Sequence, residues 1–168
     1  MIPDIILDIL HDAVFAALAG IGFGAISNPP KRAFIYIAIL AATGHAFRFI
    51  LMEKLGVDIA TASLFGALVI GFGSLWFGAR THCPMTIFSI PALLPMIPGK
   101  IAYSAIFSLI MFLQTSEDVI VQESYLNLFH TNILIALTVV SFLGVGSIIP
   151  MFLFSKKAFS LTRKKKEL

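Results

Sequence analysis

Long apolar runs separated by short polar segments make up most of the chain. A helix that crosses a bilayer needs about 20 mostly apolar residues. Five runs reach this length: residues from about 5 to the paired prolines at 29 and 30, then 33–52, 59–79, 81–116 and 124–155. Apolar runs of this length with so few charges are typical of transmembrane helices rather than strands. The pattern therefore predicts an all-α membrane protein with five transmembrane helices.

The fourth run is the only one that several prolines interrupt. Pro91, Pro95 and Pro98 are followed directly by Gly99. Each proline lacks a backbone N–H and blocks a continuing helix. Irregular backbone at membrane depth is tolerated where it is buried in protein or lines a wet cavity. We predict a broken fourth helix whose second half begins near Gly99; a turn between two short spans, giving six in all, is the alternative.

Composition agrees with a membrane protein. Of the 168 residues, 58% are hydrophobic and 12% are charged, and the mean hydropathy is +0.96. Soluble domains carry about twice this share of charge, so a soluble domain, a disordered chain and a disulfide-stapled module are excluded. We predict a transmembrane domain over residues 1–154 and a basic tail over 155–168.

The positive charge lies mostly in that tail. The net charge is +3 with 12 basic residues, and half of these lie in the last fourteen positions. Basic residues favour the cytoplasmic side. Five spans with the N-terminus outside place nine of them in the cytoplasm and one outside, so we predict a cytoplasmic C-terminus in contact with anionic lipid. No basic face with stacking aromatics exists outside the tail, so we expect no nucleic-acid partner.

The proline segment is also a candidate binding site. Half-helix N-termini at membrane breaks can point at anionic substrate groups. Lys100 stands at the predicted N-terminus and Tyr103 one turn later, an arrangement that favours a carboxylate. The alternatives are a simple proline kink with Lys100 reaching the interface and Tyr103 as an interfacial anchor.

A second candidate site lies in the second span. His45 and Arg48 are three residues apart and share a helix face. An arginine within a membrane is costly and usually faces the protein interior or water. Together the two side chains could bind an anion and couple it to a proton; otherwise Arg48 pairs with an acidic neighbour.

Other polar positions carry weaker indications. Asn132 in the last span is a candidate substrate contact, although a hydrogen bond between helices is the favoured role. Asp4, Asp8 and Asp12 recur every four residues. We interpret them as a solvated start of the first helix, with a cation- or proton-attracting mouth as the alternative.

Signatures of enzymes are missing from the sequence. We find no phosphate-binding glycine loop, no paired-histidine metal motif and no nucleophile elbow. The single cysteine, Cys83, with His82 beside it is too little for a metal site. We therefore expect no enzyme activity, cofactor or metal, and any transport must be driven by a gradient.

Several short motifs together resemble the threonine/serine exporter family, and more closely the small membrane subunit of its split form. They are Pro30-Lys31-Arg32-Ala33, Gly44-His45-x-x-Arg48, Leu94-Pro95-Met96-Ile97-Pro98-Gly99 with Tyr103, Thr131-Asn132 and Ile149-Pro150. The resemblance covers roughly residues 8–154, and Lys100 is not part of its pattern.

The resemblance implies gradient-driven export of small polar metabolites across the bacterial inner membrane. Threonine, serine and dicarboxylates such as succinate are the expected substrates, and a larger membrane subunit of the same family is the expected partner. The small size of the bundle leads us to expect an oligomer. The alternative function is an assembly subunit that stabilises a transport partner without touching substrate.

Overall fold

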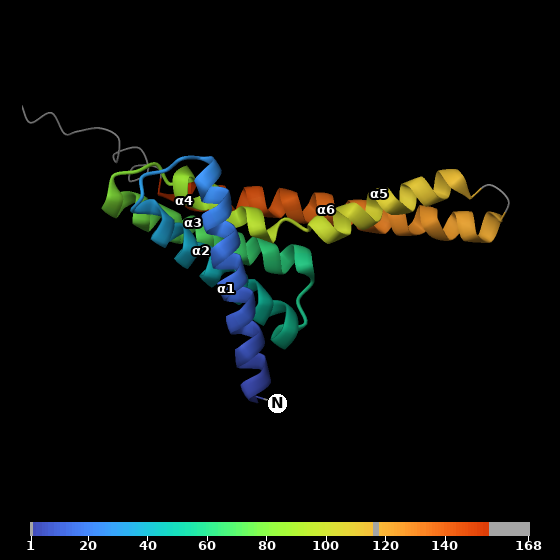
Figure 1. Ribbon diagram of the computed structural model, residues 1–168, viewed down its shortest axis with the longest axis horizontal. Helices are drawn as coiled ribbons and strands as arrows, with labels where there is room; N and C mark the ends of the chain where they lie inside the picture. Colours follow the sequence, from blue (N-terminus) through green and yellow to red (C-terminus); the bar gives the residue numbers. More distant parts are fainter. Residues whose placement is uncertain (1, 116–117, 155–168) are drawn as a thin grey trace, which may run out of the picture. The chain divides into compact units, whose positions relative to one another are not determined.

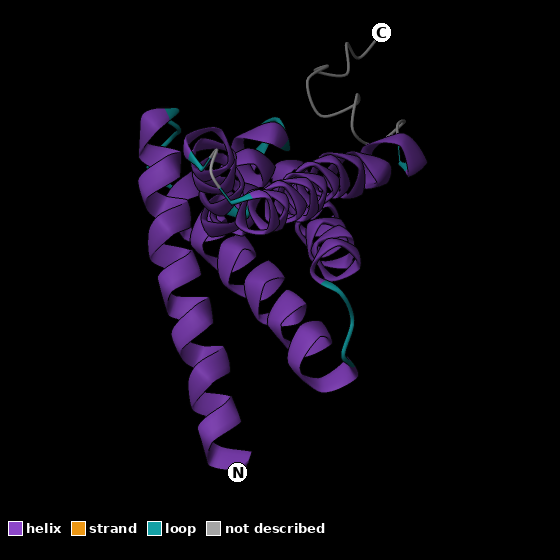
Figure 2. Ribbon diagram, turned by 90° about the vertical axis from the view of Figure 1, so that its right-hand side faces the viewer, coloured by secondary structure: helices purple, strands orange, loops and turns teal. Residues whose placement is uncertain are grey.

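Every regular element that the structure describes is a helix (Figure 1, Figure 2). The computed structural model describes residues 2–115 and 118–154, with the backbone alone for residues 2–5. The elements are α1 (Ile2–Ile26), α2 (Ala33–Leu55), α3 (Ile59–Thr81), α4 (Thr86–Leu93), the 3-10 turn η1 (Leu94–Met96), α5 (Gly99–Gln114) and α6 (Val119–Leu153). The predicted basic tail lies outside the described residues.

The predicted spans are confirmed. Helices α1, α2, α3 and α6 are long and apolar enough to cross a membrane, and a fifth span results if α4–η1 and α5 count as one broken helix. Helix α5 begins at Gly99, where the sequence predicted the second half-helix. Pro91 is accommodated inside α4, so the interruption lies between Met96 and Gly99. The orientation of the termini stays a prediction.

One predicted boundary is wrong. The last apolar run was expected to begin at residue 124, after a polar segment, but α6 begins at Val119 and includes Glu123. The reason is local, because the Asp118 carboxylate accepts hydrogen bonds from the backbone N–H groups of Ile120 and Val121. Asp118 therefore caps the helix N-terminus. Glu117 lies outside the described residues.

The helices form two compact units. Of the described residues, the first comprises 2–96 and 142–154, and the second comprises those between Ile97 and Ser141. Within the first unit, α2 packs against α1, α3 and α4, and α1 also contacts α4 and η1. Its core includes Ile37, Ile70 and Phe88, which are fully buried. The central position of α2 brings its polar residues to the meeting point of three other helices.

The second unit contains α5 and the first part of α6. The Gln122 side chain of α6 donates to the Phe112 carbonyl of α5 at 3.3 Å and so joins the two helices. On α5, the rings of Tyr103 and Phe107 stack with their centroids 6.3 Å apart.

Candidate functional site

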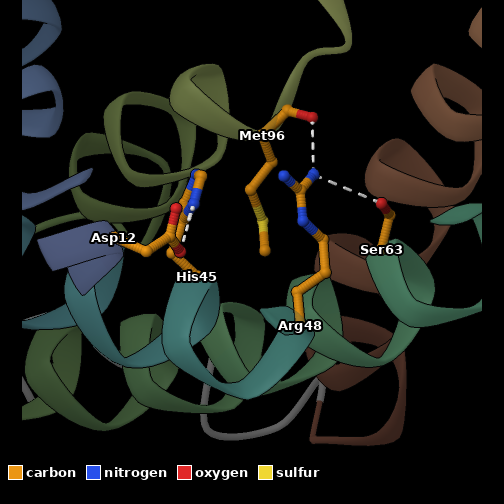
Figure 3. A network of polar contacts seen from close by, with 5 residues as sticks. All are labelled: Asp12, His45, Arg48, Ser63 and Met96. Atoms are coloured by element: carbon orange, nitrogen blue, oxygen red, sulfur yellow. Dashed lines mark hydrogen bonds and ion pairs between the residues drawn. The ribbon is translucent and has the colours of Figure 1, made fainter. Parts of the chain in front are cut away.

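A polar cluster lies inside the first unit, built around His45 and Arg48 of α2 (Figure 3). Both side chains engage groups from neighbouring elements. His45 meets Asp12 of α1, and Arg48 meets the end of η1 and Ser63 of α3. Segments widely separated in sequence therefore meet here, within helices apolar enough to span a membrane.

Two glycines let α2 and α3 approach closely beside this cluster. A Cβ added at Gly44 would lie 2.5 Å from Cδ1 and Cγ1 of Ile70 on α3, and one at Gly66 would lie 3.1 Å from the Gly44 carbonyl oxygen on α2. Both distances are shorter than ordinary contact of about 3.5–4.0 Å. Small residues are thus required at this crossing, and the close approach brings Ser63 and Met96 within reach of Arg48.

Arg48 satisfies the backbone at the helix break. Its Nη1 donates to the Met96 carbonyl at 2.9 Å and to Ser63 Oγ at 3.5 Å. The Ser63 hydroxyl in turn donates to the Ile59 carbonyl at 2.6 Å. The last carbonyls of a helix have no partner within the helix, and a cation near a helix C-terminus is favourable. Arg48 therefore holds the end of the α4–η1 segment.

His45 forms the other half of the cluster. Its Nδ1 lies 3.2 Å from Oδ2 of Asp12, and the two side chains are 8% and 35% exposed. The second ring nitrogen, Nε2, is buried and has no hydrogen-bond partner among the described residues.

Asp12 is the residue that the sequence interpretation missed. The three early aspartates were expected to form a solvated helix start. For Asp12 this is wrong, because its half-buried carboxylate contacts His45. Asp8 is exposed, in agreement with the prediction. One signal was available: two basic side chains within a membrane favour an acidic partner, and Asp12 lies deepest of the three in the first span.

The other predicted site residues are divided between the units. Pro95 lies in η1, directly before Met96, so the Arg48 contact links the first candidate site to the start of the proline segment. The remaining five belong to the second unit: Pro98 precedes α5, Gly99 and Lys100 open it, Tyr103 follows one turn later, and Asn132 lies in α6. Lys100 and Tyr103 are exposed, and Asn132 is half-buried.

Metal-binding chemistry finds no support in this part of the chain. Among the described residues, no group of three or more His, Cys, Asp or Glu side chains is arranged to hold a metal ion. Cys83 is buried and its Sγ donates to the Thr81 carbonyl at 3.5 Å, which is a local structural contact.

Comparison with known proteins decides the family. The family model described as "Threonine/Serine exporter, ThrE" matches residues 12–153. The chain belongs to the threonine/serine exporter family. The match begins at Asp12 and includes every residue of the polar cluster, so this exporter-family member carries the cluster within its family region.

One related protein is longer than this chain. An uncharacterized protein of Haemophilus influenzae strain Rd is 38% identical over 104 residues, which are 62% of this exporter-family chain and 35% of that relative. The chain thus matches about a third of the relative's length. No solved structure matches the chain.

Proposed function

We propose that the chain is the membrane subunit of a gradient-driven secondary exporter of small carboxylate-bearing metabolites. Threonine, serine and dicarboxylates such as succinate form the proposed substrate class, and a larger subunit of the same family is the proposed partner. Membership of the threonine/serine exporter family supports export as the direction of transport and small polar metabolites as the type of substrate. The bacterial inner membrane is the proposed location, with an oligomeric assembly.

The observation that carries this proposal is the Arg48 contact. A guanidinium within a candidate membrane span is bound to a neutral acceptor, the Met96 carbonyl, at 2.9 Å. A carboxylate is a stronger acceptor, and it can engage the planar fork of an arginine through two parallel hydrogen bonds. A substrate carboxylate would therefore replace the Met96 carbonyl on Arg48. The same exchange would release the end of the α4–η1 segment.

The residues of the second unit remain predicted contributors. Lys100, Tyr103 and Asn132 are proposed as substrate contacts, and Pro95, Pro98 and Gly99 as the residues that keep the backbone open. Their variants should change which substrate is preferred. His45 is the proposed proton-coupling residue.

The alternative is an assembly subunit that stabilises a transport partner without binding substrate. One observation favours it: Arg48 already has a structural partner in the Met96 carbonyl. The aligned segment covers 35% of the longer Haemophilus relative. This supports the proposal that transport needs a second subunit, whichever of the two contacts the substrate.

The deciding experiment is efflux of preloaded, labelled threonine, serine and succinate from cells. The full chain is expressed alone and then with its candidate larger subunit, as wild type, R48Q, R48K and R80Q. Arg80 is the matched control, since its guanidinium stacks over the Trp76 ring at the end of α3, 4.3 Å from the ring centroid. R48Q should reduce efflux about tenfold to a hundredfold, the factor expected for losing hydrogen bonds to a charged group.

Each outcome separates the two functions. Normal efflux from R48Q, at wild-type levels in the membrane, would exclude Arg48 as the substrate anchor. A loss of the larger subunit from the membrane in R48Q, with efflux per remaining complex unchanged, would support the assembly role. R80Q should transport normally.

A further inference from the structure

Helix α6 exposes polar side chains where a membrane helix is expected to expose apolar ones. Between residues 124 and 141, all within the second unit, six exposed positions recur at alternating steps of three and four residues. We call them the α6 seam: Ser124, Asn127, Thr131, Leu134, Thr138 and Ser141. Five of the six carry a hydroxyl or an amide group. The buried residues of this stretch, Ala136 and Val139, lie on the other side of the helix.

Helix α5 shows that the seam lies in apolar surroundings. The two helices run antiparallel (Figure 1), and the hydrogen bond from Gln122 to the Phe112 carbonyl fixes their register. Because both helices rise about 1.5 Å per residue, Phe107 lies about level with Asn127. The side chains that α5 exposes around this level are apolar or aromatic: Tyr103, Ile106, Phe107, Ile110 and Leu113. A face of this kind is covered by lipid or protein rather than by water, so water does not account for the polar seam beside it.

The polar groups of the seam are only partly satisfied by their own helix. The Thr138 hydroxyl donates to the Leu134 carbonyl at 2.8 Å. Asn127 and Thr131 have no side-chain hydrogen-bond partner among the described residues. An unpaired amide is costly at membrane depth, and polar side chains of membrane helices bond to a neighbouring helix. The α6 seam therefore requires another helix beside it, and Asn127 requires it most.

A second copy of the chain meets this requirement because the seam is complementary to itself. Alternating steps of three and four give a seven-residue repeat, the spacing at which two parallel helices pack with a left-handed crossing. Each seam residue then faces its own copy. A hydroxyl or an amide both donates and accepts, so Asn127 can bond to Asn127 and Thr131 to Thr131, while Leu134 packs against Leu134. The seam carries no charge, and Glu123 and His130 lie beside it, so pairing opposes no like charges.

We propose that two copies of the chain pair along the α6 seam, as parallel helices related by a two-fold axis along the membrane normal. This inference specifies the oligomeric assembly named in the proposed function and rests on that part of it, but its test contains no transport step. Asn127 sets the register of the pair, because the two amides meet only when the two copies are level. The larger subunit then binds elsewhere on the chain.

Cysteine cross-linking tests the pairing position by position. L134C and T138C are the seam variants, and L128C and V140C are controls at exposed positions of α6 outside the seam. The native Cys83 is buried, so the full chain needs no other change and the wild type is the background. A disulfide requires Cβ atoms about 3.5–4.5 Å apart. In oxidised membrane vesicles we expect at least about fivefold more cross-linked dimer from the seam variants than from the controls.

Substitution of Asn127 tests the hydrogen bond that sets the register. N127L should weaken the dimer about threefold to thirtyfold, the range for losing a hydrogen bond between membrane helices. N127Q keeps the amide and should retain more of the affinity than N127L, and V140L, outside the seam, should pair as the wild type does. The affinity is measured by energy transfer between full chains that carry donor or acceptor dyes at the C-terminus, in liposomes over a range of protein-to-lipid ratios.

The outcomes separate self-pairing from other uses of this face. Seam variants that cross-link no more than L128C and V140C do would overturn the pairing. Seam cysteines that react readily with a membrane-impermeant maleimide would show that the face lines water, and cross-links to the larger subunit in place of the second copy would assign the face to that subunit; either result rejects the inference. Unchanged energy transfer in N127L would remove the amide pair on which it depends.

Pairing and transport can fail independently. A chain that pairs along the α6 seam but exports none of threonine, serine and succinate would contradict the proposed transport and leave the pairing in place. A chain that exports them without pairing along the seam would contradict this inference and leave the transport in place.

Discussion

Replacing Gly44 by alanine tests the helix crossing on which the polar cluster depends. The new methyl group would lie 2.5 Å from two atoms of Ile70 and 3.4 Å from the Gly66 carbonyl oxygen. Ile70 is fully buried. Carbon atoms in contact prefer about 3.5–4.0 Å, so α2 and α3 must separate by about 1 Å or the side chain must leave its rotamer. Overpacking of this kind costs about 1–3 kcal/mol.

A matched glycine isolates this cost. Gly22 on α1 has nothing within 4 Å of its added Cβ. G22A and G44A gain the same helix propensity, about 1 kcal/mol, so the difference between them reports overpacking alone. We expect G44A to be less stable than G22A by about 1–3 kcal/mol. For a chain of this size that corresponds to a thermal midpoint about 2–12 °C lower, measured on the full chain in detergent.

A second substitution identifies the cause. I70A removes the atoms that the new methyl group would meet, at the cost of a cavity. The double variant G44A/I70A should be more stable than the sum of the two single effects predicts, by about 1 kcal/mol or more. If G44A is as stable as G22A, or if the two substitutions are simply additive, the close crossing of α2 and α3 is wrong. The arrangement of Arg48 with Ser63 and Met96, which depends on this crossing, would then be wrong as well.

Two further predictions concern a helix start and the helix break. Hydrogen bonds from Thr61, and then from Ala60, lower the pKa of Asp58, which caps α3. A lowered carboxyl pKa gives stability that is present above the unfolded pKa and is lost as the pH falls through the folded one. Below about pH 4 the wild type should therefore lose stability relative to D58N, whose amide oxygen caps at every pH; parallel pH profiles would contradict this. P98A restores a backbone donor at the break, so it should favour a continuous helix and reduce efflux at unchanged membrane levels. P29A, in the turn before α2, is its control, and normal efflux from P98A would show that the break is not required.

The helices could be predicted because a bilayer permits few backbone conformations. Backbone groups in hydrocarbon must be paired within the segment, so charge-free runs become helices and their ends follow the first charges. The break at Gly99 was equally predictable, since Pro98 cannot continue a helix. Glu123 was misassigned because an aspartate directly before an apolar run can be either a loop residue or a helix cap, and here Asp118 is a cap.

The contacts of the site were predictable only in part. His45 and Arg48 stand out because charged residues are rare in membrane spans. Their partners do not, for two different reasons. Asp12 is one of three equally spaced aspartates, and which of them meets α2 depends on how α1 crosses it, a crossing fixed by close contact between Gly20 and Ala41. The acceptor for Arg48 is a backbone carbonyl, and side-chain identity gives no sign of it.

The bond between Arg48 and the Met96 carbonyl also sets an order for insertion into the bilayer. Helix α4 has eight residues, which at 1.5 Å each reach less than half of the roughly 30 Å of hydrocarbon. Without a donor, the Met96 carbonyl at the end of η1 would cost several kcal/mol in the membrane. That donor belongs to α2, which is synthesised earlier and is long enough to enter the membrane by itself. The α4–η1 segment is therefore stable in the membrane only after α2 has inserted. Because α2 is synthesised first, Arg48 is already present when the Met96 carbonyl needs a donor.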